Sequence, residues 1–293
     1  HKELEKHPKL KVFCTATDGN HGKSVAFMAK KMGKRSVIYM PKKTVQNRIS
    51  SIKKEGAKVI IVDGGYDEAV SLAKKFVSDK NQISKNSFYS LIQDTAWKGY
   101  TKIPLNIMKG YLTQMDELSN QLGKNRIDFL FFQVGVGSWA ASILGYISKF
   151  WSNKPICISI EPFAANCLYK SISMGRSVSI DKDQETIMAG LNCGTISSLA
   201  WPILKNGLTA AMCISDNLVK KSMKILAYPK GNDKKIVSGE SGAASLGGLL
   251  GLLELNNKNN LNNKFKINKN SNILLINTEG DTDSLNYNKI ISN

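Results

Sequence analysis

Long apolar runs are absent from this sequence. No stretch reaches the roughly eighteen consecutive apolar residues that a membrane-spanning helix needs, so we expect no membrane span. The start of the chain, residues 1–11, is charged and polar, which is not typical of a signal peptide. The five cysteines are scattered and form no C-x-x-C pair, which argues against a zinc site or a disulfide framework. These absences favour a cytoplasmic protein without a metal centre.

Acidic residues are few. The 23 Asp and Glu residues face 41 Lys and Arg residues, and the formal net charge is +18. Such an excess can mark a nucleic-acid-binding surface. Here the lysines are dispersed, no arginine-rich run or aromatic-studded basic strand occurs, and residues 256–272 form an Asn- and Lys-rich surface insertion. We therefore expect no nucleic-acid partner, and keep a basic nucleic-acid binder as an alternative.

Short apolar runs alternate with helical patterns along the 293 residues, which predicts parallel sheets with helices on both faces. The expected strands are Val12–Ala16, Ser36–Met40, Lys58–Val62, Ser87–Leu91, Phe129–Gln133, Ile156–Ile160, Ala211–Ser215 and Ile273–Asn277. The expected helices are Gly22–Met32, Thr44–Glu55, Tyr66–Ser78, Ile103–Leu122, Trp139–Trp151, Asn217–Leu226 and Ser241–Glu254. We place a domain boundary near residue 103, between a small domain (1–103) and a large domain (104–293).

The loops that follow the strands have an unusual composition. Thr17-Asp18-Gly19-Asn20-His21-Gly22 joins a strand to a helix, so its backbone N–H groups suit a carboxylate or a phosphate. Gly135-Val136-Gly137-Ser138 has the same setting, although it is neither a G-x-G-x-x-G motif nor a P-loop. By itself it is equally consistent with a plain tight turn. Because ligands of open α/β sheets bind beyond the carboxyl ends of the strands, these loops are the candidate site.

Other candidate residues have an ordinary structural interpretation beside the functional one. Asp94, in Gln93-Asp94-Thr95-Ala96-Trp97, either caps the next turn or projects a carboxylate toward a ligand. His21 either packs beneath its loop or takes part in chemistry. The loops 238–242 (SGESG) and 277–283 (NTEGDTD) could be ordinary caps and turns.

Taken together, these loops and Thr186-Ile187-Met188-Ala189-Gly190-Leu191 resemble those of the diaminopropionate ammonia-lyases. This family belongs to the fold type II pyridoxal-phosphate enzymes, with the threonine dehydratases and the tryptophan synthase β chain. The resemblance runs from about Lys11 to Tyr287. It implies two doubly wound three-layer αβα domains with the site in the cleft between them, a homodimer, an amino-acid substrate and pyridoxal 5′-phosphate as the cofactor.

The resemblance also implies a role for each matching residue. Asn20 would bind the cofactor's 3′-hydroxyl, Glu240 would lie near its ring, and Asn277 or Thr278 would lie by its pyridine nitrogen, although Asn277 stands where we expect serine. The 5′-phosphate would be held by Gly135, Val136, Gly137 and Ser138. The substrate would be bound by Thr17, Asp18, Gly19, His21 and Asp94, with Asp18 and Asp94 as the acid–base carboxylates. The reaction implied is α,β-elimination of 2,3-diaminopropionate to pyruvate and ammonia.

One family element is missing from this sequence. The Schiff-base lysine of the family lies in a Phe-Lys-x-x-Gly-Gly type of motif upstream of the asparagine loop, and none of Lys2, Lys6, Lys9 and Lys11 has that context. We therefore expect that the chain lacks an N-terminal segment, including part of the large domain, and is inactive as it stands. A serine or threonine dehydratase of the same fold and a catalytically inactive homologue remain alternatives.

Overall fold

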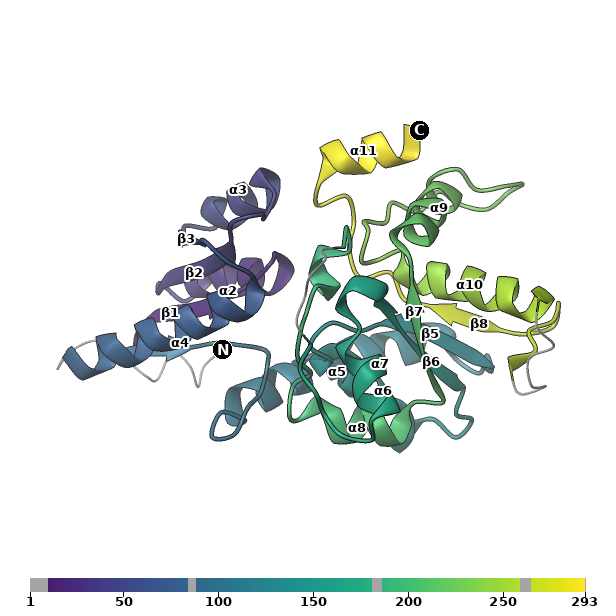
Figure 1. Cartoon of the computed structure of the whole chain (residues 1–293), viewed down its shortest axis with the longest axis horizontal. Coiled ribbons are helices and arrows are strands. Elements are labelled where there is room, and N and C mark those ends of the chain that lie inside the picture. Colours follow the sequence, from purple (N-terminus) through teal and green to yellow (C-terminus); the bar gives the residue numbers. More distant parts are fainter. Residues whose placement is uncertain (1–9, 84–87, 181–185, 259–264, 293) are drawn as a thin grey trace. The chain divides into compact units, whose positions relative to one another are not determined.

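The computed structural model describes residues 10–83, 88–180, 186–258 and 265–292, which Figure 1 traces. Lys2, Lys6, Lys9 and Ser87 lie outside these ranges. The chain divides into two compact units, His1–Asp94 (unit 1) and Thr95–Asn293 (unit 2), and each has its own four-stranded parallel sheet.

The predicted boundary near residue 103 falls at the start of α5 (Lys102–Leu122), a few residues after the division between the units. The residues before α5 are tied to unit 2 by hydrogen bonds. Ala96 N donates to Ser197 Oγ at 2.9 Å, and Ser198 N donates to Ala96 O at 3.0 Å. These contacts explain why the connecting segment groups with unit 2.

Unit 1 alternates strands and helices as the pattern predicts. Its elements are β1 (Leu10–Ala16), α2 (Asn20–Lys31), β2 (Arg35–Pro41), α3 (Gln46–Lys54), β3 (Lys58–Val62), α4 (Tyr66–Ile83) and β4 (Phe88–Leu91). The strand order is β3-β2-β1-β4, and each neighbouring pair is parallel. The loops after β1 and β4, two adjacent strands, therefore leave the sheet at the same edge.

Helices cover both faces of the unit 1 sheet because its side chains alternate. Phe13 and Ile38 pack in one apolar cluster with residues of α2 and α3. Cys14 faces the other way, with Sγ 3.9 Å from the Ala73 carbonyl oxygen of α4. The Tyr39 ring lies 5.9 Å from the ring of Phe76, which also belongs to α4. This is the three-layer arrangement that the sequence predicts.

Unit 2 repeats this architecture with longer connections. Its strands are β5 (Phe129–Gln133), β6 (Ile156–Pro162), β7 (Ala210–Ile214) and β8 (Ile273–Leu275), in the order β7-β6-β5-β8. Its predicted helices are α5, α6 (Ser138–Phe150), α9 (Asp216–Ala227) and α10 (Ala244–Lys258). The strand predicted to end at Ser215 ends one residue earlier, because the Ser215 hydroxyl accepts from Leu218 N and caps α9.

The central strand β5 is apolar on both faces of the sheet. Leu130 and Phe132 pack with the helices α5, α6 and α8 (Ala200–Gly207), whereas Phe129 and Phe131 pack with α9, α10 and α11 (Ser284–Ser292). All four side chains are buried, as is typical of a strand covered by helices on both sides. Figure 1 shows α10 along this sheet.

Three helices of unit 2 are not expected from the sequence: α7 (Cys167–Ser173), α8 and α11. Each has only seven to nine residues, so its apolar period is too short to recognise. Two 3₁₀ turns, Phe163–Ala165 and Ala189–Leu191, complete the unit. Within the described ranges, no helix is long and apolar enough to cross a membrane.

Candidate functional site

The candidate residues form two groups, one in each unit, at the carboxyl ends of the parallel strands. In unit 1 they follow β1 and β4. In unit 2 they follow β5 and β8, except Glu240, which lies in the loop between α9 and α10. β1 pairs with β4 and β5 pairs with β8, so each group is assembled by neighbouring strands. This edge is where ligands of open α/β sheets bind.

Thr17 organises the loop after β1. Its buried hydroxyl oxygen accepts from Gly19 N at 2.9 Å and from Gly22 N at 3.1 Å. The backbone N–H of Thr17 donates to Tyr39 O at 3.0 Å. The side chain that the sequence assigns to substrate binding is therefore directed into the loop.

Asp18 and Asn20 are more accessible than Thr17. Asp18 is half-buried, and Asn20 is the exposed first residue of α2. A Cβ at Gly19 would lie 3.3 Å from Cδ of Arg48, a buried residue of α3, so the loop packs closely on this arginine. The sequence offered no signal for Arg48, because a lone arginine in a helix usually lies on the solvent face.

His21 supports the loop from within unit 1. Its Nε2 lies 2.7 Å from the Ile92 carbonyl oxygen and 3.1 Å from Thr15 Oγ1. Because a carbonyl oxygen only accepts, Nε2 carries the hydrogen of that contact. The structure therefore favours the packing role for His21, since this nitrogen connects the start of α2 to the end of β4.

Gln93 holds Asp94 in place. The fully buried Gln93 Oε1 accepts from Thr15 Oγ1 at 2.8 Å and from Ala16 N at 3.0 Å. Its Nε2 lies 2.9 Å from Tyr66 Oη and 3.1 Å from Asp94 Oδ1, and the Tyr66 hydroxyl is 3.4 Å from the same carboxylate oxygen. Asp94 is thus oriented by Gln93, two residues beyond β4, and by Tyr66 of α4, which is more than a helix cap requires.

In unit 2, the turn between β5 and α6 fits a phosphate group. Gly137 is the N-cap of α6 with φ +90°. Because glycine has no side chain, the N–H groups at the start of this 13-residue helix receive no side-chain cap from it. A Cβ at Gly135 would lie 2.8 Å from Gly190 O and 3.3 Å from Cys193 Sγ. The turn therefore needs glycine at both positions, and its backbone N–H groups and helix N-terminus suit an anion.

The segment 186–193 packs against this turn. Gly190 N donates to Ser241 Oγ at 3.1 Å, which joins the segment to the SGESG loop. At its other end, Thr186 Oγ1 donates to Asp216 Oδ1 at 2.6 Å, and Ile187 N lies 3.2 Å from Asp216 Oδ2. Asp216, at the start of α9, thereby holds a segment that contacts the turn 135–138.

Asn277 and Thr278, the two candidates for the pyridine nitrogen, differ in their surroundings. The Asn277 amide is occupied by the SGESG loop and its flank: Oδ1 accepts from Ser238 Oγ at 2.9 Å, and Nδ2 donates to Val237 O at 3.1 Å. Thr278 Oγ1 instead accepts from Nε2 of Gln133, the last residue of β5. Asn277 is therefore a loop connector, and Thr278 is the better candidate for a ligand contact.

Gln133 combines burial with an unsatisfied atom. Its side chain is 3% exposed, and Oε1 has no hydrogen-bond partner within the described part of the chain. A buried acceptor left unpaired costs about 1–3 kcal/mol. Sequence reasoning missed this residue, although a glutamine that ends an all-apolar strand is a usable signal.

Glu240 is buried within the SGESG loop, and α11 supports it. Asn286 Nδ2 donates to Glu240 Oε1 at 2.6 Å. The neighbouring Ser241 N donates to Glu279 Oε1 at 2.7 Å, so the two acidic loops are joined. Glu279 therefore has a structural role in unit 2, which explains part of the local acidity noted in the sequence.

A second buried carboxylate, Glu161, lies at the carboxyl end of β6. It is 1% exposed, and burial raises its pKa to about 7, although N–H donation from Leu168 and Tyr169 opposes this rise. Those N–H groups lie 2.8 and 2.7 Å from its two oxygens. Glu161 therefore anchors α7 to the sheet.

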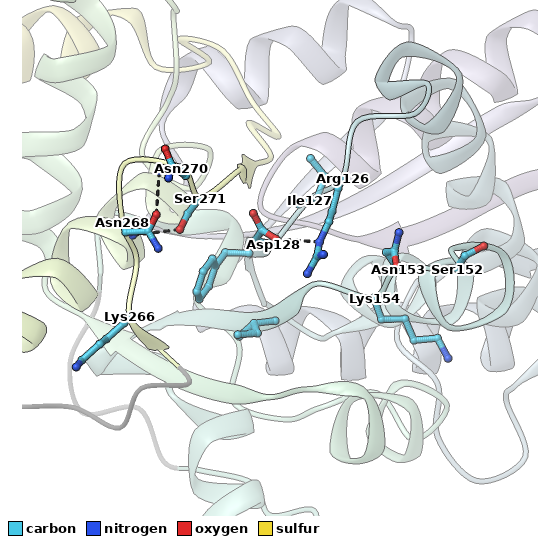
Figure 2. Close-up of a pocket in the computed structure, with 12 residues that line it drawn as sticks. Arg126, Ile127, Asp128, Ser152, Asn153, Lys154, Lys266, Asn268, Asn270 and Ser271 are labelled. Atoms are coloured by element: carbon cyan, nitrogen blue, oxygen red, sulfur yellow. Dashed lines mark hydrogen bonds and ion pairs between the residues drawn. The ribbon is translucent and has the colours of Figure 1, made fainter.

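The opposite edge of the unit 2 sheet has a hollow of about 540 Å³, beside the amino ends of β5 and β6. Figure 2 shows that Lys154 and Lys266, which line it, point in different directions. Arg126 is paired with Asp128 at 3.1 Å. These side chains do not converge on one point. Across the described ranges, no group of three His, Cys, Asp or Glu side chains could hold a metal ion.

All five cysteines are free, and Cys213 is less buried than the other four. Burial raises the pKa of the Cys14, Cys157 and Cys213 thiols to about 12, so these three are protonated near neutral pH. Protonated, buried thiols are poor nucleophiles and poor metal ligands.

Comparison with known proteins agrees with this geometry. Residues 1–279 match the family of pyridoxal-phosphate dependent enzymes. The chain is 40% identical over 282 residues to diaminopropionate ammonia-lyase of Escherichia coli strain K12. The aligned region covers 95% of this chain and 69% of that protein. Its similarity to threonine dehydratase 1 of Solanum lycopersicum is lower, at 32% identity over 58% of this chain and 25% of that protein.

A crystal structure shows the same relationship. The E. coli diaminopropionate ammonia-lyase, in complex with an aminoacrylate-PLP azomethine reaction intermediate, aligns with a TM-score of 0.86 and 38% identity. The alignment covers 96% of this chain and 71% of that one. The predicted fold class and the predicted family are therefore confirmed. The chain belongs to the diaminopropionate ammonia-lyase family of pyridoxal-phosphate-dependent enzymes.

Proposed function

We propose that this protein is a carbon–nitrogen lyase that converts 2,3-diaminopropionate to pyruvate and ammonia by α,β-elimination. The observation that carries the proposal is the 40% identity to a diaminopropionate ammonia-lyase over 95% of the chain. The dehydratase similarity is weaker and covers less of the chain. The loops at the carboxyl ends of both sheets supply the residue types that such a reaction needs.

Unit 2 would hold the cofactor through its turn and loops. The N–H groups of the turn Gly135–Ser138 would bind the phosphate, because a helix N-terminus stabilises negative charge. The Thr278 hydroxyl would contact the ring nitrogen, and Glu240 would lie near the ring. When bound, pyridoxal phosphate withdraws electrons from the α-carbon of the substrate and stabilises negative charge there. In unit 1, the exposed amide of Asn20 would bind the cofactor's 3′-hydroxyl.

Two carboxylates of unit 1 would handle the protons. Asp94, oriented by Gln93 and Tyr66, would take the proton from the substrate α-carbon. Asp18 would bind the β-ammonium group of the substrate, which leaves more easily when protonated. A carboxylate paired with an ammonium would also favour the diamine over serine, whose hydroxyl carries no charge. The backbone of the loop 17–21 would hold the substrate carboxylate.

The rate of turnover on two substrates separates this proposal from its nearest rival. The full-length protein, purified and loaded with pyridoxal phosphate, should release two ammonia molecules for each pyruvate from 2,3-diaminopropionate, and act more slowly on serine. Equal or faster turnover of serine, with one ammonia for each pyruvate, would assign the protein to the dehydratases. Both products are measured by coupled dehydrogenase assays under the same conditions.

A different experiment addresses the catalytically inactive homologue. Borohydride reduction of the full-length protein with bound pyridoxal phosphate, followed by peptide mapping, should recover a pyridoxyl-lysine peptide upstream of the asparagine loop. Cofactor binding without any such peptide, and without turnover of the diamine, would favour the inactive homologue. Salt-sensitive binding of DNA or RNA, measured in the same preparation, would instead support the basic nucleic-acid binder.

We also propose a homodimer in the cytoplasm. The free cysteines, four of the five buried, support a reducing compartment. The dimer rests on the family resemblance. Light scattering of the purified protein should give twice the mass of the subunit, and cell fractionation should recover the protein with the cytoplasmic markers. A monomeric mass or a membrane-associated fraction would contradict the respective proposal.

A further inference from the structure

Gln133 occupies a position where its polarity has no evident benefit for stability. It ends β5, whose other residues are Phe-Leu-Phe-Phe, and it is 3% exposed. Its Oε1 has no hydrogen-bond partner in the described part of the chain. An apolar side chain of the same length would avoid this unsatisfied acceptor. The reason for a glutamine at this position must therefore lie in the contacts of its other polar atom, Nε2.

The orientation of the Gln133 amide follows from its two neighbours. Nε2 lies 3.3 Å from the Ile276 carbonyl oxygen, which can only accept a hydrogen bond. The NH₂ group must therefore face the 276–278 segment, and its second hydrogen is donated to Thr278 Oγ1. This contact joins the end of β5 to the loop that follows its partner strand β8, across 145 positions of sequence.

The hydrogen bond from Gln133 Nε2 leaves the Thr278 hydroxyl to act as a hydrogen-bond donor. Its oxygen accepts from Gln133, so its own hydrogen must point away from Gln133. Over the ranges that the structure describes, no protein acceptor receives that hydrogen. A hydroxyl with its oxygen engaged and its hydrogen available is a directed donor.

We propose that Gln133 is a positioning residue that directs the Thr278 hydroxyl hydrogen toward the ring nitrogen of the bound cofactor. This inference rests on the proposed function, which places Thr278 beside that nitrogen. A donor aimed at the ring nitrogen favours the unprotonated ring, because a hydrogen bond to the neutral form opposes protonation. Gln133 itself touches neither the cofactor ring nor the substrate in this account, and acts through Thr278.

A double-mutant cycle in the full-length protein, loaded with pyridoxal phosphate, tests this coupling. The variants are Gln133→Met, which keeps the length of the side chain and removes both donors, Thr278→Val, which removes the hydroxyl, and the two combined. Each single variant should lower kcat about tenfold, with a smaller change in KM. Each should also change the pH dependence of the bound cofactor's absorbance. The combined variant should match Thr278→Val alone.

Thr278→Ser provides the matched background, because it keeps the hydroxyl. Gln133→Met should lower kcat in this background as it does in the wild type, and should have no effect beside Thr278→Val. Additive losses in the cycle would overturn the inference. So would a Gln133→Met protein that is less stable to heat but keeps the wild-type absorbance profile and kcat, since that result assigns Gln133 to a purely structural contact with Ile276.

The inference and the proposed function fail in different ways. If the wild type produces no pyruvate from 2,3-diaminopropionate, the proposed function fails, and the absorbance cycle still measures the coupling of Gln133 to Thr278. If the wild type is active and the cycle is additive, only the inference fails. Should Gln133→Met not fold, Gln133→Leu supplies a second apolar replacement that suits the rest of β5.

Discussion

The turn between β5 and α6 allows a sharp test of cofactor binding by the substitution Gly135→Ala. The new Cβ would lie 2.8 Å from the Gly190 carbonyl oxygen and 3.3 Å from Cys193 Sγ. The first contact is with backbone, so relief requires that the turn or the 186–193 segment move by about half an ångström. Misplacement of about 1 Å in a binding site can cost about 10²-fold. We therefore expect about a tenfold loss of pyridoxal phosphate affinity, or about 1.4 kcal/mol.

The assay compares two ligands that differ only in the phosphate. Fluorescence titration should show weaker binding of pyridoxal phosphate to the Gly135→Ala variant and unchanged binding of pyridoxal. Gly145→Ala is the matched control, because Gly145 lies inside the same helix, α6, and a Cβ there meets nothing within 4 Å. Alanine is the better helix former, so this control should bind both ligands normally and gain about 0.5–1 kcal/mol of stability.

Two results would refute this reasoning. Wild-type affinity of Gly135→Ala for pyridoxal phosphate would show that the turn does not hold the phosphate. An equal loss for both ligands would show that the substitution disturbs the fold of unit 2 in general. Circular dichroism and thermal unfolding of both variants distinguish these outcomes, since a local displacement leaves the helix content unchanged.

Three further predictions concern residues in both units. Asp94→Asn keeps the oxygen that Gln93 contacts, so it should retain bound cofactor in absorbance spectra while kcat falls by about 10²–10⁴-fold; unchanged turnover would remove Asp94 from the mechanism. Thr17→Val leaves two loop N–H groups without their acceptor and should lower the free energy of unfolding in urea by about 1–3 kcal/mol, more than Thr17→Ser does. Glu161 has a folded-state pKa of about 7 against a usual 4.5, so the folded protein retains this proton to higher pH than the unfolded chain. The contribution of this proton to stability is present below pH 4.5 and is lost as the pH rises through about 7. The unfolding free energy of the wild type should therefore fall across this window by about 3 kcal/mol relative to that of Glu161→Gln. Parallel pH profiles for the two proteins would contradict the raised pKa of Glu161.

Much of the fold follows from local pattern. The strand Lys58–Val62 and the strand Phe129–Gln133 are found with their predicted ends, because each is a short apolar or β-branched run between polar turns. The helices α7, α8 and α11 were missed because seven to nine residues hold too few turns for a period to show. The identity of the loops as candidate sites also followed from sequence, since glycine and polar residues directly follow apolar strands.

The roles within those loops did not follow from sequence. Thr17 and Asn277 were assigned to ligands, yet their side chains serve neighbouring loop segments. Gln93 and Gln133 attracted no functional assignment, yet they orient Asp94 and Thr278. In each case the deciding contact is one hydrogen bond whose direction depends on which group lies opposite.

The sequence by itself determined the alternation of elements, the family and the loops in which the chemistry would reside, because each depends on residues that are near one another in the chain. Only the tertiary structure decided which side chains in those loops remain for a ligand. Parallel pairing brings the ends of β5 and β8 together, so residues 145 positions apart become hydrogen-bond partners. Most buried donors and acceptors are paired, and the partner of each is known only once the sheet has assembled.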